Sequence, residues 1–154
     1  MQTTIRKAAL KDLDILLAFE QGIVQSERPF DPTLKDGEPH YYDLAALMTS
    51  PDAYVVVAEI ENRIIGSGYT KIRKAEPWLK HEIYAYMGFM YVDPAFRGKG
   101  LIKKILDELY VWIRERKIKE VRLEVYADNA PAIQAYTKAG FKANMVEMRM
   151  ELDV

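Results

Sequence analysis

The stretch Tyr91-Val92-Asp93-Pro94-Ala95-Phe96-Arg97-Gly98-Lys99-Gly100-Leu101-Ile102 is the most informative part of this sequence. An apolar strand is expected to end at Val92, and a loop with Gly98 and Gly100 then opens directly into a helix. The first amides of a helix lack partners within it and lie at the positive end of its dipole, so they favour an anion. Because glycine has no side chain, phosphate oxygens can approach several of these amides.

Basic residues surround this turn. Arg97, Lys99 and Lys103 add positive charge next to the helix start. The pattern is not a Walker loop, because no Gly-Lys-Ser/Thr closes it, and it is not a dinucleotide fingerprint, because the third glycine is missing. Taken alone, a glycine pair between a strand and a helix is also typical of a plain tight turn.

Apolar periodicity predicts the elements downstream of the turn. One helix is expected from a stripe at 3.6-residue spacing, Leu101, Ile102, Ile105, Leu106, Leu109, Trp112 and Ile113. A strand is expected at 121–126 and a helix at 130–139, with Asn129 as N-cap and Gly140 as its stop. Residues 141–152 are expected to supply the last strand material, because Val146, Met148, Met150 and Leu152 alternate.

Upstream of the turn, antiparallel strands are expected to precede the parallel crossover. A strand is expected at 3–8, helices at 10–24 and 41–48, and strands at 54–60, 64–72 and 82–92. Gly88 interrupts the last of these strands, which predicts a bulge or a close approach of ligand or backbone. The pattern predicts an α/β (α+β) fold, with a mixed central sheet of six to seven strands, about four helices and helices on both faces.

The totals exclude several classes of protein. A chain of 154 residues is expected to form one domain. Its 22 basic and 23 acidic residues argue against nucleic acid as a partner. There is no cysteine, and therefore no disulfide, thiolate metal site or cysteine nucleophile. No signal region or membrane-spanning run is evident, so the cytoplasm is the expected location and no membrane partner is expected.

The turn resembles the acyl-CoA signature of the GNAT N-acetyltransferases, in which Val-x-Pro and Arg/Gln-x-x-Gly-x-Gly/Ala follow an apolar strand. The residues that fit are Val92, Pro94, Arg97, Gly98, Lys99 and Gly100. Residues 123–136, followed by Gly140-Phe141, are similar to a second family signature. The two signatures together imply the GNAT fold for a single domain of residues 1–154. Ile102 departs from the motif. Its place on the apolar stripe predicts that its side chain turns inward, leaving its N–H free; if it faced the phosphates instead, this branched residue would weaken cofactor binding.

The resemblance implies how acetyl-CoA would bind as co-substrate. The backbone of Met90 and Val92 would pair with the pantetheine arm like an added strand, and residues 98–103 would hold the pyrophosphate. Asn129 would hydrogen-bond the cofactor, and Tyr136 would lie near its sulfur. The residues implied in cofactor binding are Met90, Tyr91, Val92, Arg97, Gly98, Lys99, Gly100, Leu101, Ile102, Lys103, Asn129 and Tyr136.

The implied reaction is direct attack of an amine on the thioester in a ternary complex. Tyr136 is the expected general acid, because a phenol with a pKa near 10 is protonated at neutral pH and can donate to the leaving thiolate. Glu124 is the expected general base, with Glu82 and a water chain as alternatives. A carboxylate on a strand is also commonly just exposed to solvent. Tyr84, Tyr86 and Tyr91 fit either a substrate cleft or simple packing.

The acceptor remains open at this level. In the family, the segment between the first two helices grips the acceptor, and residues 26–43 carry five acidic and two basic side chains here. An acidic rim would attract a cationic amine. His40 and His81 lack metal-ligand spacing, so no metal is expected. A homodimer is an open option. The alternatives to an enzyme are a non-catalytic acyl-CoA-binding or sensing module and an interaction protein without cofactor.

Overall fold

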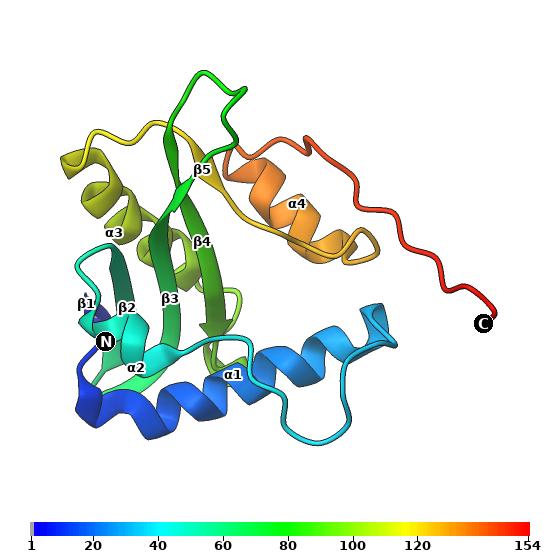
Figure 1. Cartoon of the computed structure of the whole chain (residues 1–154). Helices are drawn as coiled ribbons and strands as arrows, with labels where there is room; N and C mark the ends of the chain where they lie inside the picture. Colours follow the sequence, from blue (N-terminus) through cyan, green and yellow to red (C-terminus); the bar gives the residue numbers. More distant parts are fainter. Residues whose placement is uncertain (1) are drawn as a thin grey trace. The chain divides into compact units, whose positions relative to one another are not determined.

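The computed structural model describes residues 2–154, and the chain divides into two compact units, Met1–Glu124 and Val125–Val154. The first unit contains, in order, β1 (Thr4–Lys7), α1 (Leu13–Glu27), α2 (Leu44–Thr49), β2 (Ala53–Ile60), β3 (Arg63–Lys74), β4 (Ile83–Val92), α3 (Leu101–Glu115) and β5 (Val121–Arg122). Short 3-10 turns lie at Leu10–Asp12, Arg28–Phe30 and Pro94–Phe96. The second unit contains α4 (Ala130–Lys138) (Figure 1).

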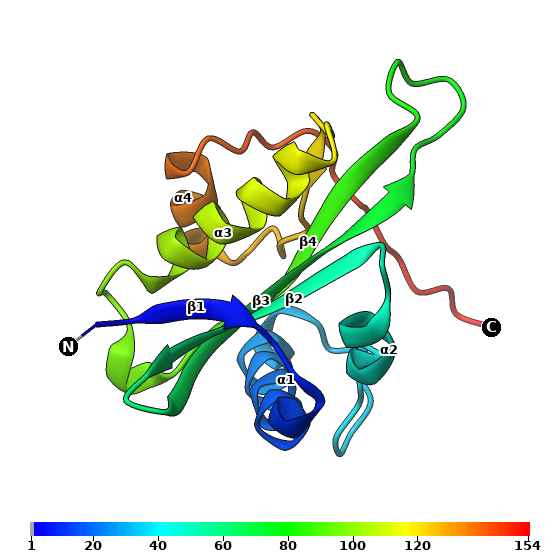
Figure 2. The same cartoon turned by 90° about the vertical axis from the view of Figure 1, so that its left-hand side faces the viewer.

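The strands of the first unit form one mixed sheet in the order β1-β2-β3-β4-β5. The first four strands are antiparallel neighbours, and β5 runs parallel to β4 after the crossover through α3. Helix α3 covers one face of the sheet, and α1 and α2 cover the other (Figure 2). The mixed sheet, the parallel crossover and the presence of helices on both faces are thus confirmed.

The expected number of strands was wrong, because the sheet has five strands and not six or seven. The strand expected at 121–126 is reduced to Val121–Arg122, and residues 141–154, all of them described, contain no helix or strand. Alternating apolar residues indicate that one face of a segment is apolar, but not that another segment lies beside it. A strand exists only where another chain segment pairs with its backbone groups. The alternating side chains are exposed, among them Met148 at 90% and Met150 at 82%.

The core forms separate layers on the two faces of the sheet. On the α1 side, Leu16 and Phe19 pack with the strand residues Val57, Tyr69 and Phe89. On the α3 side, the buried cluster comprises Ala85, Trp112, Ile113 and Ile118. Six of the seven residues in the expected α3 stripe are buried, and Ile102 is half-buried at its margin. Each fully buried aliphatic side chain contributes about 1.5–3 kcal/mol to stability.

Gly88 lies at a bulge in β4, which confirms the irregularity expected there. The pairing of β3 with β4 shifts register between Ser67 and Tyr69, so that Tyr69 faces Gly88 whereas Ser67 faces Tyr91. A Cβ atom at position 88 would lie 2.5 Å from Cε1 of Tyr69. Tyr69 is only 2% exposed. The glycine is therefore required by the close approach of a buried ring.

Gly88→Ala is expected to lower the free energy of unfolding by about 1–3 kcal/mol, because the new methyl group overpacks the core against Tyr69. Chemical denaturation of the two proteins measures the difference. In a Tyr69→Ala background the same substitution should cost far less, since the clashing ring is gone. An equal cost in both backgrounds would contradict the assignment of the clash.

Candidate active site

The turn between β4 and α3 leaves open space above two glycines. Gly98 and Gly100 both have φ of +77°, and an added Cβ at either one would have no heavy atom within 4 Å. Gly100 is the N-cap residue of α3 in a left-handed conformation. Asp93 stabilises the start of the turn, since its Oδ1 accepts a bond from Ala95 N at 2.9 Å. The space above both glycines is thus open where α3 begins, which fits an approaching phosphate.

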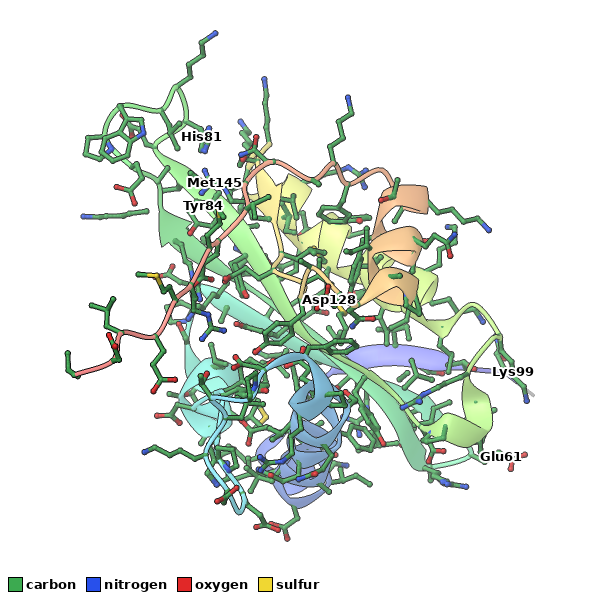
Figure 3. All side chains as sticks on the ribbon, turned by 90° about the vertical axis from the view of Figure 1, so that its right-hand side faces the viewer. Glu61, His81, Tyr84, Lys99, Asp128 and Met145 are labelled. Carbon is green, nitrogen blue, oxygen red and sulfur yellow. The ribbon has the colours of Figure 1, made fainter. Side chains whose placement is uncertain are left out.

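The three basic side chains at the turn differ in how firmly they are held. The guanidinium of Arg97 donates through Nε to the carbonyl of Val92 at 2.9 Å, which ties it to the end of β4. Lys103 forms a 2.7 Å ion pair with Asp107 one helical turn later, and both side chains are exposed. Such surface pairs contribute little, so Lys103 can exchange its partner for a phosphate. Lys99 projects from the same end of the sheet (Figure 3).

The side to which the backbone amides of β4 point changes along the strand. Ala85 N donates to Glu120 O at 2.9 Å, so odd-numbered amides face β5 at the start of β4. Asp93 N donates to Ile65 O at 2.7 Å, so odd-numbered amides face β3 just after its end. The bulge between these points reverses the alternation, and Met90 and Val92 therefore present their amides to the β5 side.

This edge is unpaired over its second half. Within the described part of the first unit, β5 pairs with β4 only at Ala85 and Tyr86. The backbone of Met90 and Val92 is therefore available to a ligand that adds as an extended strand. The positions that the family resemblance implies for the pantetheine arm, the backbone of Met90 and Val92, stay a prediction.

Glu124 belongs to a polar group on the α1 side of the sheet. Its carboxylate hydrogen-bonds Tyr86, whose hydroxyl pKa is raised first by burial and then by this negative charge. Burial raises the pKa of Tyr69 to about 12, an effect that the Arg73 guanidinium opposes and the Glu124 carboxylate adds to. The Arg73 guanidinium lies 3.7 Å from the centroid of the Tyr86 ring. The sequence pointed to Glu124, but it did not decide whether Tyr86 lines a substrate cleft or packs in the core. Arg73 was missed, because no local pattern relates β3 to residue 124.

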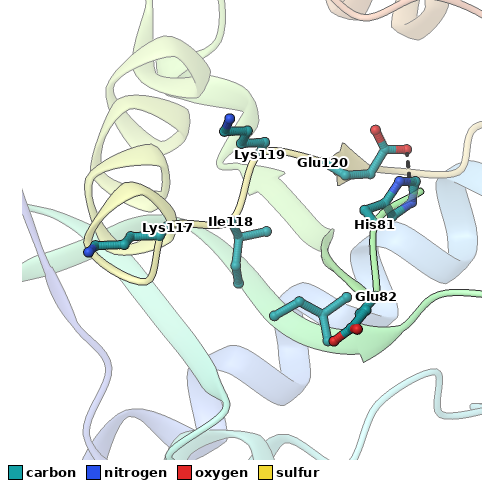
Figure 4. Close-up of a pocket in the computed structure, with 7 residues that line it drawn as sticks. His81, Glu82, Lys117, Ile118, Lys119 and Glu120 are labelled. Atoms are coloured by element: carbon teal, nitrogen blue, oxygen red, sulfur yellow. Dashed lines mark ion pairs between the residues drawn. The ribbon is translucent and has the colours of Figure 1, made fainter. Parts of the chain in front are cut away.

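Glu82 lies at the opposite end of β4 from the glycine turn. It lines a pocket of about 390 Å³ together with His81, Ile83 and residues 117–120 (Figure 4). Nε2 of His81 lies 3.8 Å from Oε2 of Glu120 there. Glu82 and Met90 are eight residue steps apart, or about 26 Å at the usual strand rise. Glu82 is thereby too far from the Met90 edge for direct proton transfer.

The second unit contains the two remaining predicted residues. Asn129 is the N-cap of α4 as expected, and its Oδ1 accepts a bond from Ala132 N at 3.3 Å. Its side-chain amide group remains a separate donor. Tyr136 packs edge-on against Phe141, with ring centroids 6.0 Å apart. Gly140, with φ of +106°, follows the end of α4, which confirms its expected role.

The acidic segment before α2 is only partly exposed. Asp31 is 6% exposed, and its Oδ1 accepts a bond from Thr33 N at 2.9 Å, so it stabilises a turn and cannot form part of an acidic rim. Asp36 and Glu38 are exposed. Burial raises the pKa of Glu27 at the end of α1. Across residues 2–154, no three side chains of His, Cys, Asp or Glu are grouped as a metal site, and no helix is long and apolar enough to cross a membrane.

Comparison with known proteins identifies relatives for most of the chain. The model of the acetyltransferase (GNAT) family matches residues 21–141. A mycothiol acetyltransferase of Saccharomonospora viridis is 33% identical over 96 residues, which cover 59% of this chain and 30% of that protein. The mycothiol acetyltransferase of Actinosynnema mirum is 28% identical over 125 residues, or 79% of this chain and 35% of that protein. The chain thus spans about a third of the length of these curated relatives.

Solved structures share the fold across nearly the whole chain. A predicted acetyltransferase from Clostridium acetobutylicum, solved with acetyl-CoA, has a TM-score of 0.75 at 22% identity, covering 97% of this chain and 96% of that one. A protein from Bacillus halodurans has a TM-score of 0.87 at 18% identity, covering 97% and 99%. At these identities the likeness shows the fold alone.

Proposed function

Because the chain belongs to the acetyltransferase (GNAT) family, we propose that it transfers an acetyl group from acetyl-CoA to a primary amine in a ternary complex. The observation that carries this proposal is the bulged edge of β4, which turns the amides of Met90 and Val92 outward. This edge leads directly into the open glycine turn at the start of α3. An extended arm would lie along the β4 edge, and the pyrophosphate at its end would lie at the glycine turn.

In the proposed reaction the amine nitrogen attacks the thioester carbonyl carbon, and the carbon–sulfur bond breaks. Glu124, or a water chain, takes a proton from the ammonium group. Tyr136 donates its hydroxyl proton to the departing CoA thiolate. The carboxylate of Glu124 would attract a cationic amine. The absence of cysteine agrees with direct transfer, since no thiol is available to carry the acetyl group.

We also propose that the two units act as one catalytic domain, because the family model extends from α1 in the first unit to Phe141 in the second. The alternative function is a sensing module that binds acyl-CoA without turnover. It is favoured by Ile102, which is only half-buried where the family motif has glycine or alanine. A cytoplasmic location, a homodimer and the lack of nucleic-acid partners remain predictions.

Calorimetry with acetyl-CoA, followed by detection of free CoA thiol against a panel of amines, tests the proposed function. The panel includes small amines, peptide amino termini, lysine peptides and deacetylated mycothiol, since the curated relatives are named for mycothiol. Binding with turnover on any acceptor supports the enzyme. Binding without turnover across the panel supports the sensing module, and no binding would overturn the assignment of residues 97–103.

A further inference from the structure

We propose that Tyr42 is a positioning residue for acetyl-CoA, because its hydroxyl clamps the β4 bulge and thereby decides which amides of β4 face the cofactor. This inference rests on the proposed function for its effect on turnover. This clamp, the hydrogen bond that Phe89 N donates to the Tyr42 hydroxyl, lies within the first unit and can be measured without turnover.

The bulge places a phenylalanine in an unfavourable backbone conformation. Phe89 has φ of +58°, in the left-handed region that residues with a Cβ avoid. Phe89 and Met90 together lie opposite one β3 residue, because the pairs on either side are Gly88 with Tyr69 and Tyr91 with Ser67. A left-handed non-glycine residue persists only where its surroundings hold it. The structure must therefore provide contacts that stabilise Phe89.

Two hydroxyl groups bind the two backbone groups of Phe89. Its N–H donates to the Tyr42 hydroxyl at 3.2 Å. Its carbonyl accepts from Ser67 Oγ at 3.0 Å, and Ser67 is 0% exposed. The Tyr42 ring also packs edge-on against Phe89, with centroids 5.3 Å apart. Both backbone groups that the bulge removes from the sheet ladder are satisfied in this way.

Tyr42 is itself held by a buried carboxylate from α1. Glu20 is 0% exposed, and its Oε2 accepts bonds from Tyr41 N at 2.8 Å and Tyr42 N at 2.9 Å. Its Oε1 lies 2.7 Å from Nδ1 of His40. Glu20 thus fixes the backbone of the segment before α2, and Tyr42 carries that constraint to β4. The α1–α2 connection and the proposed cofactor strand are linked by this chain of hydrogen bonds.

The clamp has a direct consequence for the cofactor edge. Without the extra bulge residue, the odd-numbered amides that face β5 at Ala85 would continue to do so to the end of β4. Met90 and Val92 would then turn their amides towards β3. By holding Phe89 out of the ladder, Tyr42 and Ser67 keep the amides of Met90 and Val92 on the open edge.

Tyr42→Phe tests the clamp, because it keeps the ring and removes only the hydroxyl. Tyr54→Phe is the matched control. Tyr54 loses a hydroxyl bond to Glu108 of 2.9 Å, on the α3 side of the sheet. In Tyr42→Phe, amide hydrogen exchange at Phe89 is expected to be about tenfold faster. The value of kcat/KM for acetyl-CoA is expected to fall roughly 10- to 100-fold, while KM for the amine changes little.

Each outcome decides the proposal. Unchanged exchange at Phe89 in Tyr42→Phe overturns it, as does an equal loss of kcat/KM in Tyr54→Phe. Faster exchange with unchanged kcat/KM also overturns it, because the clamp then has no effect on the cofactor. If the wild-type protein turns over no amine, the proposed function fails. The clamp is then judged from Phe89 exchange and from the dissociation constant of acetyl-CoA, which should weaken in Tyr42→Phe alone.

Discussion

Tyr136→Phe is expected to lower kcat roughly 100-fold, because general acid catalysis typically contributes 10²- to 10⁴-fold. The substitution removes the hydroxyl proton that the proposed reaction gives to the CoA thiolate. It keeps the ring, and so preserves the edge-on contact with Phe141. Acetyl-CoA affinity, measured by calorimetry, should therefore fall far less than kcat. Steady-state release of CoA thiol gives kcat.

The pH profile separates a general acid from a packing residue. In the wild type, kcat should fall at alkaline pH once the Tyr136 hydroxyl ionises, because the ionised phenol has no proton to donate. Tyr136→Phe should lose this alkaline limb. Tyr110→Phe, on α3, is a control that removes a half-buried phenol elsewhere. A decrease in kcat of less than threefold in Tyr136→Phe, with the alkaline limb retained, would rule out its role as the acid.

The double variant Gly98→Ala/Gly100→Ala is expected to weaken acetyl-CoA binding about 100-fold, or roughly 2.7 kcal/mol. In the proposed complex each new Cβ would stand between backbone amides and phosphate oxygens, and charge-assisted hydrogen bonds of this kind are worth about 1.5–3 kcal/mol each. Both positions also have positive φ, which an alanine adopts at a cost. Calorimetric titration with acetyl-CoA measures the change.

Gly37→Ala distinguishes the loss of ligand contacts from backbone strain. Gly37 has φ of +84° and, like the two turn glycines, nothing within 4 Å of an added Cβ. Its substitution imposes similar strain in the segment before α2, outside the glycine turn. Thermal unfolding should shift in both variants, but only the turn variant should lose acetyl-CoA affinity. Equal affinity losses, or none in the turn variant, would remove residues 98–100 from the cofactor site.

The proposed base illustrates where sequence reasoning stopped. Glu124 and Glu82 were both strand carboxylates in the sequence pattern, and no periodicity separated them. The structure separates them through their neighbours, since Glu124 hydrogen-bonds Tyr86 and Glu82 lines the distant pocket with His81. These neighbours come from strands and loops remote in sequence. Their positions depend on the sheet order, which local patterns do not contain.

In the last part of the chain, the sequence pattern predicted a strand that the structure does not contain. Alternating Val146, Met148, Met150 and Leu152 predicted a strand, but residues 141–154 form none. Their apolar side chains are exposed, at 77% for Val146 and 65% for Leu152. Strand propensity is context-dependent, because it reports packing against neighbours more than an intrinsic backbone preference. An alternating pattern without a paired neighbour does not make a strand.

The sequence by itself determined the features that depend on neighbours within a few residues. The apolar stripe of α3, the glycine turn before it and the capping of α4 by Asn129 were all readable, because helices and turns close their hydrogen bonds locally. Only the tertiary structure decided the bulge clamp. Phe89 meets Ser67 across 22 residues and Tyr42 across 47, and such contacts exist only once the sheet and α1 have assembled. The direction of the β4 amides, on which cofactor binding is proposed to depend, is therefore a property of the assembled fold.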